Sequence, residues 1–262
     1  MHNRELDILL RSHDPVLLSQ TIMDVCEAKV RAAIPPLVKL LAAPDAAVWA
    51  NAAYALGQLG SQDLQIVAPV LVRLLADPDS LVRSEAVDAL GFLRYIPAID
   101  PLVKVLEDDE DPLVRASAAE VLGEFGEERA LTPMLQALHD ADDSVRAFAA
   151  ASIGLLGTPD LLPLLQAQLE SEETPRVKAE LLSTGYRLGK EEDLQQLLDL
   201  LTNADENLAT VILNILEDLA SRKTPSTVSS DRARINEALL ALGQRIPMLG
   251  SRAQQIIDRF TR

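Results

Sequence analysis

Aromatic residues and cysteine are scarce in this sequence. Only 3% of the residues are Phe, Trp or Tyr, although 48% are hydrophobic. A core made chiefly of Leu, Ala, Val and Ile suits close helix packing better than a β-sandwich. The single cysteine, Cys26, excludes an internal disulfide and fits a reducing compartment. We interpret Cys26 as a small buried residue on an apolar helix face, rather than the anchor of a cofactor or of a cluster that bridges two chains.

Positive charge and long apolar runs are also lacking. The net charge of −16 argues against a nucleic-acid backbone or an anionic membrane as the main partner. No apolar run approaches the roughly 20 residues that span a bilayer. The first residues, MHNRELDILLRSHD, show no signal-peptide pattern. We therefore expect a cytoplasmic protein without membrane insertion and without a nucleic-acid partner.

Residues that carry chemistry are few. The three histidines, His2, His13 and His139, form no recognisable pair, and no Cys/His set has metal-ligand spacing. Neither GxxxxGK[ST] nor a GxGxxG after a strand occurs. The sequence therefore predicts no catalytic, metal-binding or cofactor-binding residue and no cofactor. It favours a protein that is not an enzyme, without deciding the point.

A repeated phrase dominates what is present. Residues 111–126 read DPLVRASAAEVLGEFG, and residues 142–157 read DDSVRAFAAASIGLLG. One reference position of this phrase recurs every 31 to 34 residues, at Val48, Val82, Val114, Val145, Val177 and Leu208. A fixed period in this range indicates stacked structural units.

Each unit reads as two helices. Apolar and small residues follow helical spacing after each reference valine, and a second amphipathic run of similar length, such as IDPLVKVLED, separates the phrases. Asp and Pro before the valine are typical of a helix start. A glycine twelve positions on is expected to end the helix in the left-handed conformation, at Gly60, Gly126, Gly157 and Gly189, with Arg94 in its place in the second copy. We predict an all-α fold, a right-handed α-solenoid of stacked antiparallel helix pairs.

The pattern DPDxxVRxxAAxALGxLG resembles the HEAT repeat, in the short form of the phycobilisome-lyase-type (PBS lyase HEAT-like) proteins, over about residues 30–220. The resemblance implies that an Asp before the second helix and an Arg at its start link successive repeats. The matching residues are Asp79 with Arg83, Asp111 with Arg115, and Asp142 or Asp143 with Arg146. Trp49, Lys178 and Ala209 stand at the Arg position in other copies.

The chain divides into three predicted segments. Residues 1–220 form the solenoid, with about six repeats and an N-terminal cap. Residues 221–230 are polar and aperiodic, which predicts a linker or loop, and residues 231–262 form a C-terminal helical cap. From residue 221 onward there are eight basic and three acidic residues. This basic segment either pairs with acidic neighbouring repeats or contacts an acidic partner.

The resemblance also implies that the second helix of each repeat lines a concave groove. Positions 3, 6 and 10 after each reference valine would then face a partner protein. The candidate partner-binding residues at these positions are Asn51, Tyr54, Gln58, Glu85, Asp88, Phe92, Glu120, Glu124, Phe148, Leu155 and Arg187. Ser117, Ala151, Glu180 and Ser183 share the same positions. The alternative is that Phe92 and Phe148 turn sideways and fill gaps between helices.

Two functions fit this pattern. The first is a non-enzymatic scaffold or assembly factor that grips a protein partner in the groove, with apolar anchors inside a charged rim. The alternative, implied by the resemblance, is a subunit of a bilin (phycobiliprotein) lyase or a bilin-handling chaperone. Bilin propionates need basic residues, and the groove offers Arg187 against several carboxylates, so the scaffold is favoured. A role in cofactor delivery stays open.

Overall fold

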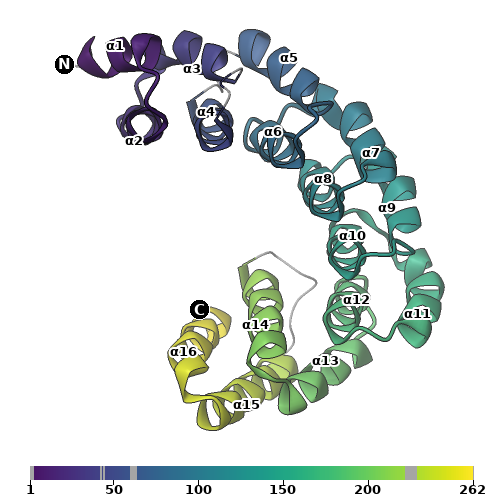
Figure 1. Cartoon of the computed structure of the whole chain (residues 1–262). Helices are drawn as coiled ribbons and strands as arrows, with labels where there is room; N and C mark the ends of the chain where they lie inside the picture. The colour runs from purple at the N-terminus through teal and green to yellow at the C-terminus, as the bar shows by residue number, and fades with distance from the viewer. Residues whose placement is uncertain (1–2, 42, 44, 60–63, 222–228, 262) are drawn as a thin grey trace. The chain divides into compact units, whose positions relative to one another are not determined.

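The computed structural model describes residues 3–41, 43, 45–59, 64–221 and 229–261. Within these ranges the chain forms sixteen α-helices and no strand (Figure 1). Their bounds are α1 Asn3–Arg11, α2 Pro15–Glu27, α3 Ile34–Leu40, α4 Ala46–Leu59, α5 Leu64–Leu74, α6 Ser80–Phe92, α7 Ile99–Asp108, α8 Pro112–Phe125, α9 Leu131–Ala137, α10 Asp143–Leu156, α11 Leu162–Ser171, α12 Pro175–Arg187, α13 Glu192–Asn203, α14 Glu206–Ser221, α15 Ser229–Arg245 and α16 Pro247–Thr261.

The helices gather into two compact units, residues 1–133 and 134–262. In the first unit the helices form two layers, with α1, α3, α5 and α7 in one and α2, α4, α6 and α8 in the other (Figure 1). Each helix of the second layer packs on the next, α2 on α4, α4 on α6 and α6 on α8. In the second unit α10 packs on α12 and α12 on α14. The predicted all-α solenoid of stacked helix pairs is confirmed.

The repeat positions make the core. The reference valines from Val48 to Val177 are buried, and so are the alanine pairs of α4, α8 and α10. Small side chains let successive helices of the second layer approach closely. At Gly91, for example, an added Cβ would lie 2.8 Å from a methyl carbon of Val121 on α8. The sequence period therefore corresponds to the contact between one repeat and the next.

Helix starts follow the prediction more closely than helix ends. The side chains of Asp14, Asp79, Asp111 and Asp142 accept hydrogen bonds from the first backbone N–H groups of α2, α6, α8 and α10. Left-handed backbone follows the helices at Gly126 (φ 74°) and Gly189 (φ 104°), and Arg94 adopts it without being glycine (φ 47°).

Two of the predicted helix ends differ or lie outside the described residues. The expectation for Gly157 is wrong, since its φ is −78° and its ψ 168°. The chain leaves α10 in extended backbone at Gly157 and stays extended at Thr158, which precedes Pro159 and is restricted to that conformation. Gly60 lies outside the described residues.

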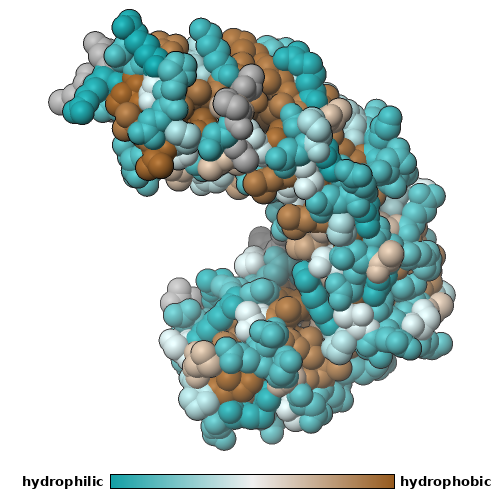
Figure 2. All heavy atoms as spheres, viewed as in Figure 1, coloured by the Kyte–Doolittle hydropathy of each residue, from teal (hydrophilic) through white to brown (hydrophobic). Residues whose placement is uncertain are grey.

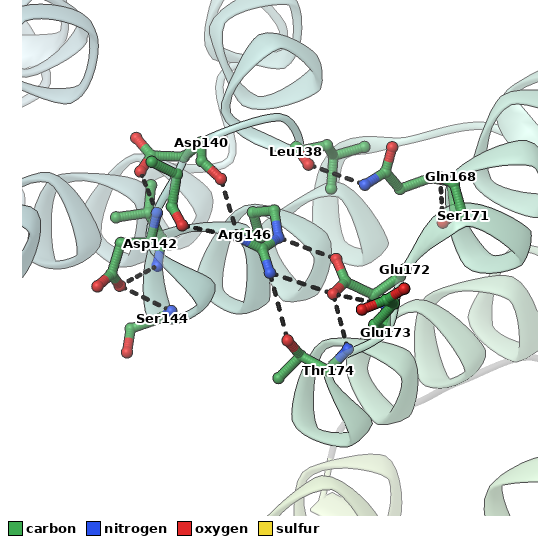
Figure 3. Close-up of polar contacts among 12 residues, drawn as sticks. Leu138, Asp140, Asp142, Ser144, Arg146, Gln168, Ser171, Glu172, Glu173 and Thr174 are labelled. Carbon is green, nitrogen blue, oxygen red and sulfur yellow. Dashed lines mark hydrogen bonds and ion pairs between the residues drawn. The ribbon is translucent and has the colours of Figure 1, made fainter.

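Arg83 and Arg146 at the start of the second helices do link successive repeats, but their acceptors lie farther along the chain than the capping aspartates of their own repeats. Arg115, the third predicted arginine, donates hydrogen bonds to the backbone carbonyls of Asp109 and Glu110, in the turn before its own helix. Arg83 forms two hydrogen bonds with the Asp109 carboxylate, at 2.7 and 2.8 Å. Arg146 does the same with Glu172, at 2.9 and 3.1 Å (Figure 3). In both cases the partner stands 26 residues later, in the turn before the next second helix. This bidentate geometry fixes the stacking of one repeat on the next.

The C-terminal helices share a hydrophobic core with α12, α13 and α14. Arg252 and Arg259 of α16 form ion pairs with Glu217 of α14, at 3.0 and 2.8 Å. Arg245 donates hydrogen bonds to the carbonyls at the end of α13. Most of the predicted linker, residues 222–228, lies outside the described residues, and Ser229 and Ser230 already belong to α15.

Candidate functional site

The predicted partner-binding residues lie on five second-layer helices, in two groups. In the first unit, α4 carries Asn51, Tyr54 and Gln58, α6 carries Glu85, Asp88 and Phe92, and α8 carries Glu120 and Glu124. In the second unit, α10 carries Phe148 and Leu155, and α12 carries Arg187. Because each group belongs to a different compact unit, we describe the groups separately.

An exposed aromatic pair marks the first unit. Tyr54 of α4 and Phe92 of α6 meet edge to face, with ring centroids 6.2 Å apart and ring planes at 88°. This geometry suits the positive edge of one ring against the negative face of the other. Phe92 nevertheless keeps 60% of its surface exposed. Phe92 therefore does not fill a gap between helices.

A hollow of about 440 Å³ opens beside this pair, between α6 and α8. One aromatic ring, three carboxylates and one guanidinium line it, together with Gly91 and Val121. The five groups belong to Phe92, to Asp88, Glu120 and Glu124, and to Arg94. Arg94 lines it because the left-handed backbone at this residue ends α6. The structure thus brings together four of the predicted residues, Asp88, Phe92, Glu120 and Glu124, in one place.

The carboxylates of this hollow interact unfavourably with one another. The pKa of Asp88 is raised from 3.8 to about 6, first by burial and then by the negative charges of Glu85 and Glu124, while a hydrogen bond with Ser117 opposes the change. Partial burial and the charges of Glu124 and Asp88 raise the pKa of Glu120. Burial raises the pKa of Glu85 as well. The fold therefore holds a concentrated negative charge that lacks full compensation.

In the second unit the corresponding residues contact one another. The guanidinium of Arg176 lies 5.6 Å from the centroid of the half-buried Phe148 ring, a cation–π contact. Arg187 forms an ion pair with Asp218 of α14. The pKa of Glu180 is raised to about 7 by burial, against the opposing charges of Arg176 and Arg187. Arg187, the predicted basic residue of the groove, already has an acidic partner.

The sequence reasoning missed one position of the face. The residue just before each reference valine precedes the first predicted position by four residues, so it lies on the same side of the helix. In the first unit Leu81 and Leu113 occupy it, and both are exposed. In the second unit Ser144 and Arg176 occupy it and are joined by a hydrogen bond of 3.3 Å. Extending the helical spacing one turn towards the N-terminus would have found these residues.

The predicted burial of Cys26 is wrong, since this residue is only half-buried in the described part of the chain. There, no group of three or more His, Cys, Asp or Glu side chains could hold a metal ion. No helix among the described residues is long and apolar enough to cross a membrane. The face in Figure 2 is largely hydrophilic, with hydrophobic patches among the charged residues. An arrangement of this kind suits recognition of another molecule by surface contact.

The stacked helix pairs, their buried valine and alanine ladder and the linking arginines define an α-solenoid. The family model for HEAT repeats matches residues 5–91, 67–147 and 131–216. Since these matches together cover most of the chain, the chain belongs to the HEAT-repeat family. No functionally curated protein matches the sequence.

Two solved structures share this fold. The complex of CpcE and CpcF of phycocyanin lyase from Nostoc sp. PCC7120 is 19% identical, with a TM-score of 0.63, over 87% of this chain and 93% of that chain. The Escherichia coli protein YibA is 17% identical, with a TM-score of 0.57, over 100% of this chain and 93% of that chain. At these identities the similarity shows the fold alone.

Proposed function

We propose that this protein is a non-enzymatic scaffold or assembly factor that holds a partner protein against α4, α6 and α8. The observation that carries the proposal is the exposed Phe92 ring, supported edge-on by Tyr54 and placed beside a carboxylate-lined hollow. Only 3% of the residues in this chain are aromatic, and the exposed part of the Phe92 ring does not contribute to the core. Aromatic anchors within a polar rim are the usual centre of protein-binding surfaces.

The electrostatics of the hollow support the same proposal. A negative group at Asp88 is unfavourable for folding, because burial and the neighbouring carboxylates disfavour its charged form. Residues that weaken a fold are commonly those that function requires. A positively charged partner would relieve this repulsion on binding and would also associate faster.

Capture of the partner tests the proposal. Tagged wild-type protein, the Phe92→Ser variant and the Leu164→Ser variant would be used to isolate partners from the source organism. Leu164 is a matched control, since it is an exposed leucine (43%) on α11, a helix outside the proposed surface. We expect one partner to be retained by the wild type and by Leu164→Ser and lost with Phe92→Ser. Equal retention by all three proteins would place the binding site elsewhere.

A second candidate function is a subunit of a bilin lyase. The observation that favours it is the similarity of fold to the CpcE and CpcF complex of phycocyanin lyase. The hollow of the first unit is unfavourable for propionate groups, because three carboxylates and one arginine line it. The test is incubation with a bilin and an apo-phycobiliprotein, alone and together with a second lyase subunit. Stoichiometric colour would support the lyase subunit, and its absence in both arms would leave the scaffold.

We further propose that α15 and α16 cap the solenoid rather than form a separate binding surface. The ion pairs of Arg252 and Arg259 with Glu217, and the hydrogen bonds of Arg245 to the end of α13, support this role. Basic residues that pair with the neighbouring acidic repeat protect its exposed end. Replacing Glu217 by Gln should therefore lower the thermal stability of the protein without changing partner capture.

A further inference from the structure

The exposed leucines extend the candidate surface into an ordered row along each helix. On α6 the row consists of Leu81, Glu85, Asp88 and Phe92, at successive spacings of four, three and four residues. These spacings keep all four residues on one face of the helix. Leu81 is 45% exposed, so the row is open to solvent at its N-terminal end as well as at Phe92. An apolar residue therefore stands at each end, with carboxylates between them.

The neighbouring helix α8 repeats most of this order. Its row begins with Leu113, which is 59% exposed, and continues through Ser117, Glu120 and Glu124. The two rows lie side by side, since α6 packs on α8 and the hydroxyl groups of Ser84 and Ser117 are 3.2 Å apart. Together the two helices present a band of two leucines, a band of carboxylates and, at the far end, Phe92, which contacts Tyr54 of α4. We name this surface, Leu81 to Phe92 with Leu113 to Glu124, the banded face.

The banded face has a measurable length. Leu81 and Phe92 are eleven positions apart, which corresponds to roughly 16 Å along the helix axis at 1.5 Å per residue. A partner helix laid along α6 would match this length with side chains eleven positions apart on its own surface. Basic residues four and seven positions after the first apolar residue would meet the carboxylate band.

We propose that the banded face binds an amphipathic helix of a partner protein that carries two apolar residues about eleven positions apart and lysine or arginine residues between them. This inference rests on the proposed function and specifies the chemistry of the partner. Charge complementarity favours a positively charged partner helix, because three carboxylates and one basic residue, Arg94, are among the described residues that line the hollow. The two apolar bands decide the spacing.

A second copy of this chain suits the banded face less well than a basic helix of a partner protein does. The chain carries a net charge of −16, so two copies repel each other at low ionic strength. Three arginines of the C-terminal helices already have partners, since Arg252 and Arg259 bind Glu217 and Arg245 binds backbone carbonyls.

Synthetic peptides test the inference directly. One labelled helical peptide would carry two leucines eleven positions apart with lysines at the fourth and seventh positions between them. A second peptide would carry glutamates in place of the lysines, and a third would shorten the leucine spacing by two residues. Fluorescence anisotropy would measure their dissociation constants for the wild type, for Leu81→Ser with Leu113→Ser, and for the control Leu164→Ser. All three proteins should melt alike, because the substituted leucines are exposed.

We expect the lysine peptide to bind the wild type and the Leu164→Ser control equally, and the double leucine variant at least tenfold more weakly. The glutamate and shortened peptides should also bind at least tenfold more weakly. No binding of the lysine peptide, or equal binding to the double variant, would overturn the inference. Self-association of the wild type that is lost with the double variant would also overturn it, in favour of a second copy as the occupant.

The partner-capture experiment separates this inference from the proposed function. Loss of the native partner with Phe92→Ser, but not with Leu81→Ser and Leu113→Ser, would leave the scaffold standing and remove the leucine band from its site. Retention of the partner by both variants would remove the proposed function and the inference together.

Discussion

Replacing Asp88 by asparagine should stabilise the fold, because the charge of Asp88 opposes folding. The pKa of this carboxyl is raised from 3.8 to about 6 by burial, then by the charges of Glu85 and Glu124. Asparagine removes the charge and keeps an oxygen that can accept a hydrogen bond from Ser117. The other charged groups of the site, Glu120 on α8 and Arg94 after α6, remain unchanged by this substitution.

The size of the effect follows from proton linkage. A rise from 3.8 to about 6 corresponds to about 3 kcal/mol at 1.36 kcal/mol per pKa unit. Because the carboxylate is partly exposed and screened by solvent, we expect about 1 kcal/mol. The stability that neutral Asp88 contributes is fully present below pH 3.8 and is lost as the pH rises through about 6. The advantage of Asp88→Asn should therefore be absent near pH 4 and complete above pH 6.

Urea unfolding at a series of pH values between about 4 and 8 measures this dependence. A gain of about 1 kcal/mol should appear directly in the free energy of unfolding from urea. In parallel thermal unfolding it should appear as a rise of roughly 2–4 °C in Tm for a protein of this size. The matched exposed control is Glu107→Gln, since Glu107 is an exposed carboxylate of α7 and its substitution should leave the free energy of unfolding nearly unchanged at every pH.

Replacing Glu172 by glutamine should have the opposite effect on stability, because the charge of Glu172 favours folding. Burial alone would raise the pKa of Glu172, but hydrogen bonds from Arg146 and from the Thr174 backbone outweigh it and hold the pKa at about 2. Its charge therefore stabilises the fold above pH 4.5, and this stability is lost as the pH falls towards 2. The substitution should cost about 3 kcal/mol at neutral pH.

If Asp88→Asn also lost stability at pH 8, Asp88 would be a structural residue and the argument for its role in binding would fail.

Three further substitutions have expected effects that can be measured. Ala119→Arg should destabilise by several kcal/mol in thermal unfolding, since Ala119 is fully buried between stacked helices. Gly185→Ala should cost about 1–3 kcal/mol in urea unfolding, because a Cβ there would overlap the Asp193 carboxylate. Glu120→Lys combined with Glu124→Lys should slow association with a basic partner at low salt and flatten its dependence on ionic strength, as measured by stopped flow; an unchanged association rate would separate these carboxylates from the encounter surface.

The repeat made most of the fold predictable. A recurring valine, a following pair of small residues and a preceding aspartate are constraints of burial and capping, and each acts on its own repeat. The structure confirms them at Val114, Ala118 and Asp111. The linking role of Arg83 and Arg146 was implied by the resemblance to the HEAT repeat. Their acceptors, Asp109 and Glu172, were missed, although an acidic residue stands five positions before four successive reference valines, at Asp77, Asp109, Asp140 and Glu172.

Helix ends were less predictable than helix starts. Glycine permits the left-handed conformation without requiring it. Gly157 leaves its helix in extended backbone, whereas Arg94 adopts left-handed backbone in a repeat that lacks the glycine. That substitution places a guanidinium in the wall of the hollow. The departure from the repeat thus created a feature of the candidate site.

The same helical face makes different contacts in each unit, and the residue before the reference valine accounts for much of the difference. On α12 this residue is Arg176, which covers Phe148 and opposes the burial of Glu180. On α6 and α8 it is a leucine, which cannot pair with the carboxylates further along the row. Packing constrains the buried positions of both units alike and leaves this face free to vary. In the second unit the face is largely occupied by its own arginine contacts, whereas in the first unit exposed apolar residues flank carboxylates that repel one another. A partner therefore gains most, in both apolar burial and charge, by binding the first unit.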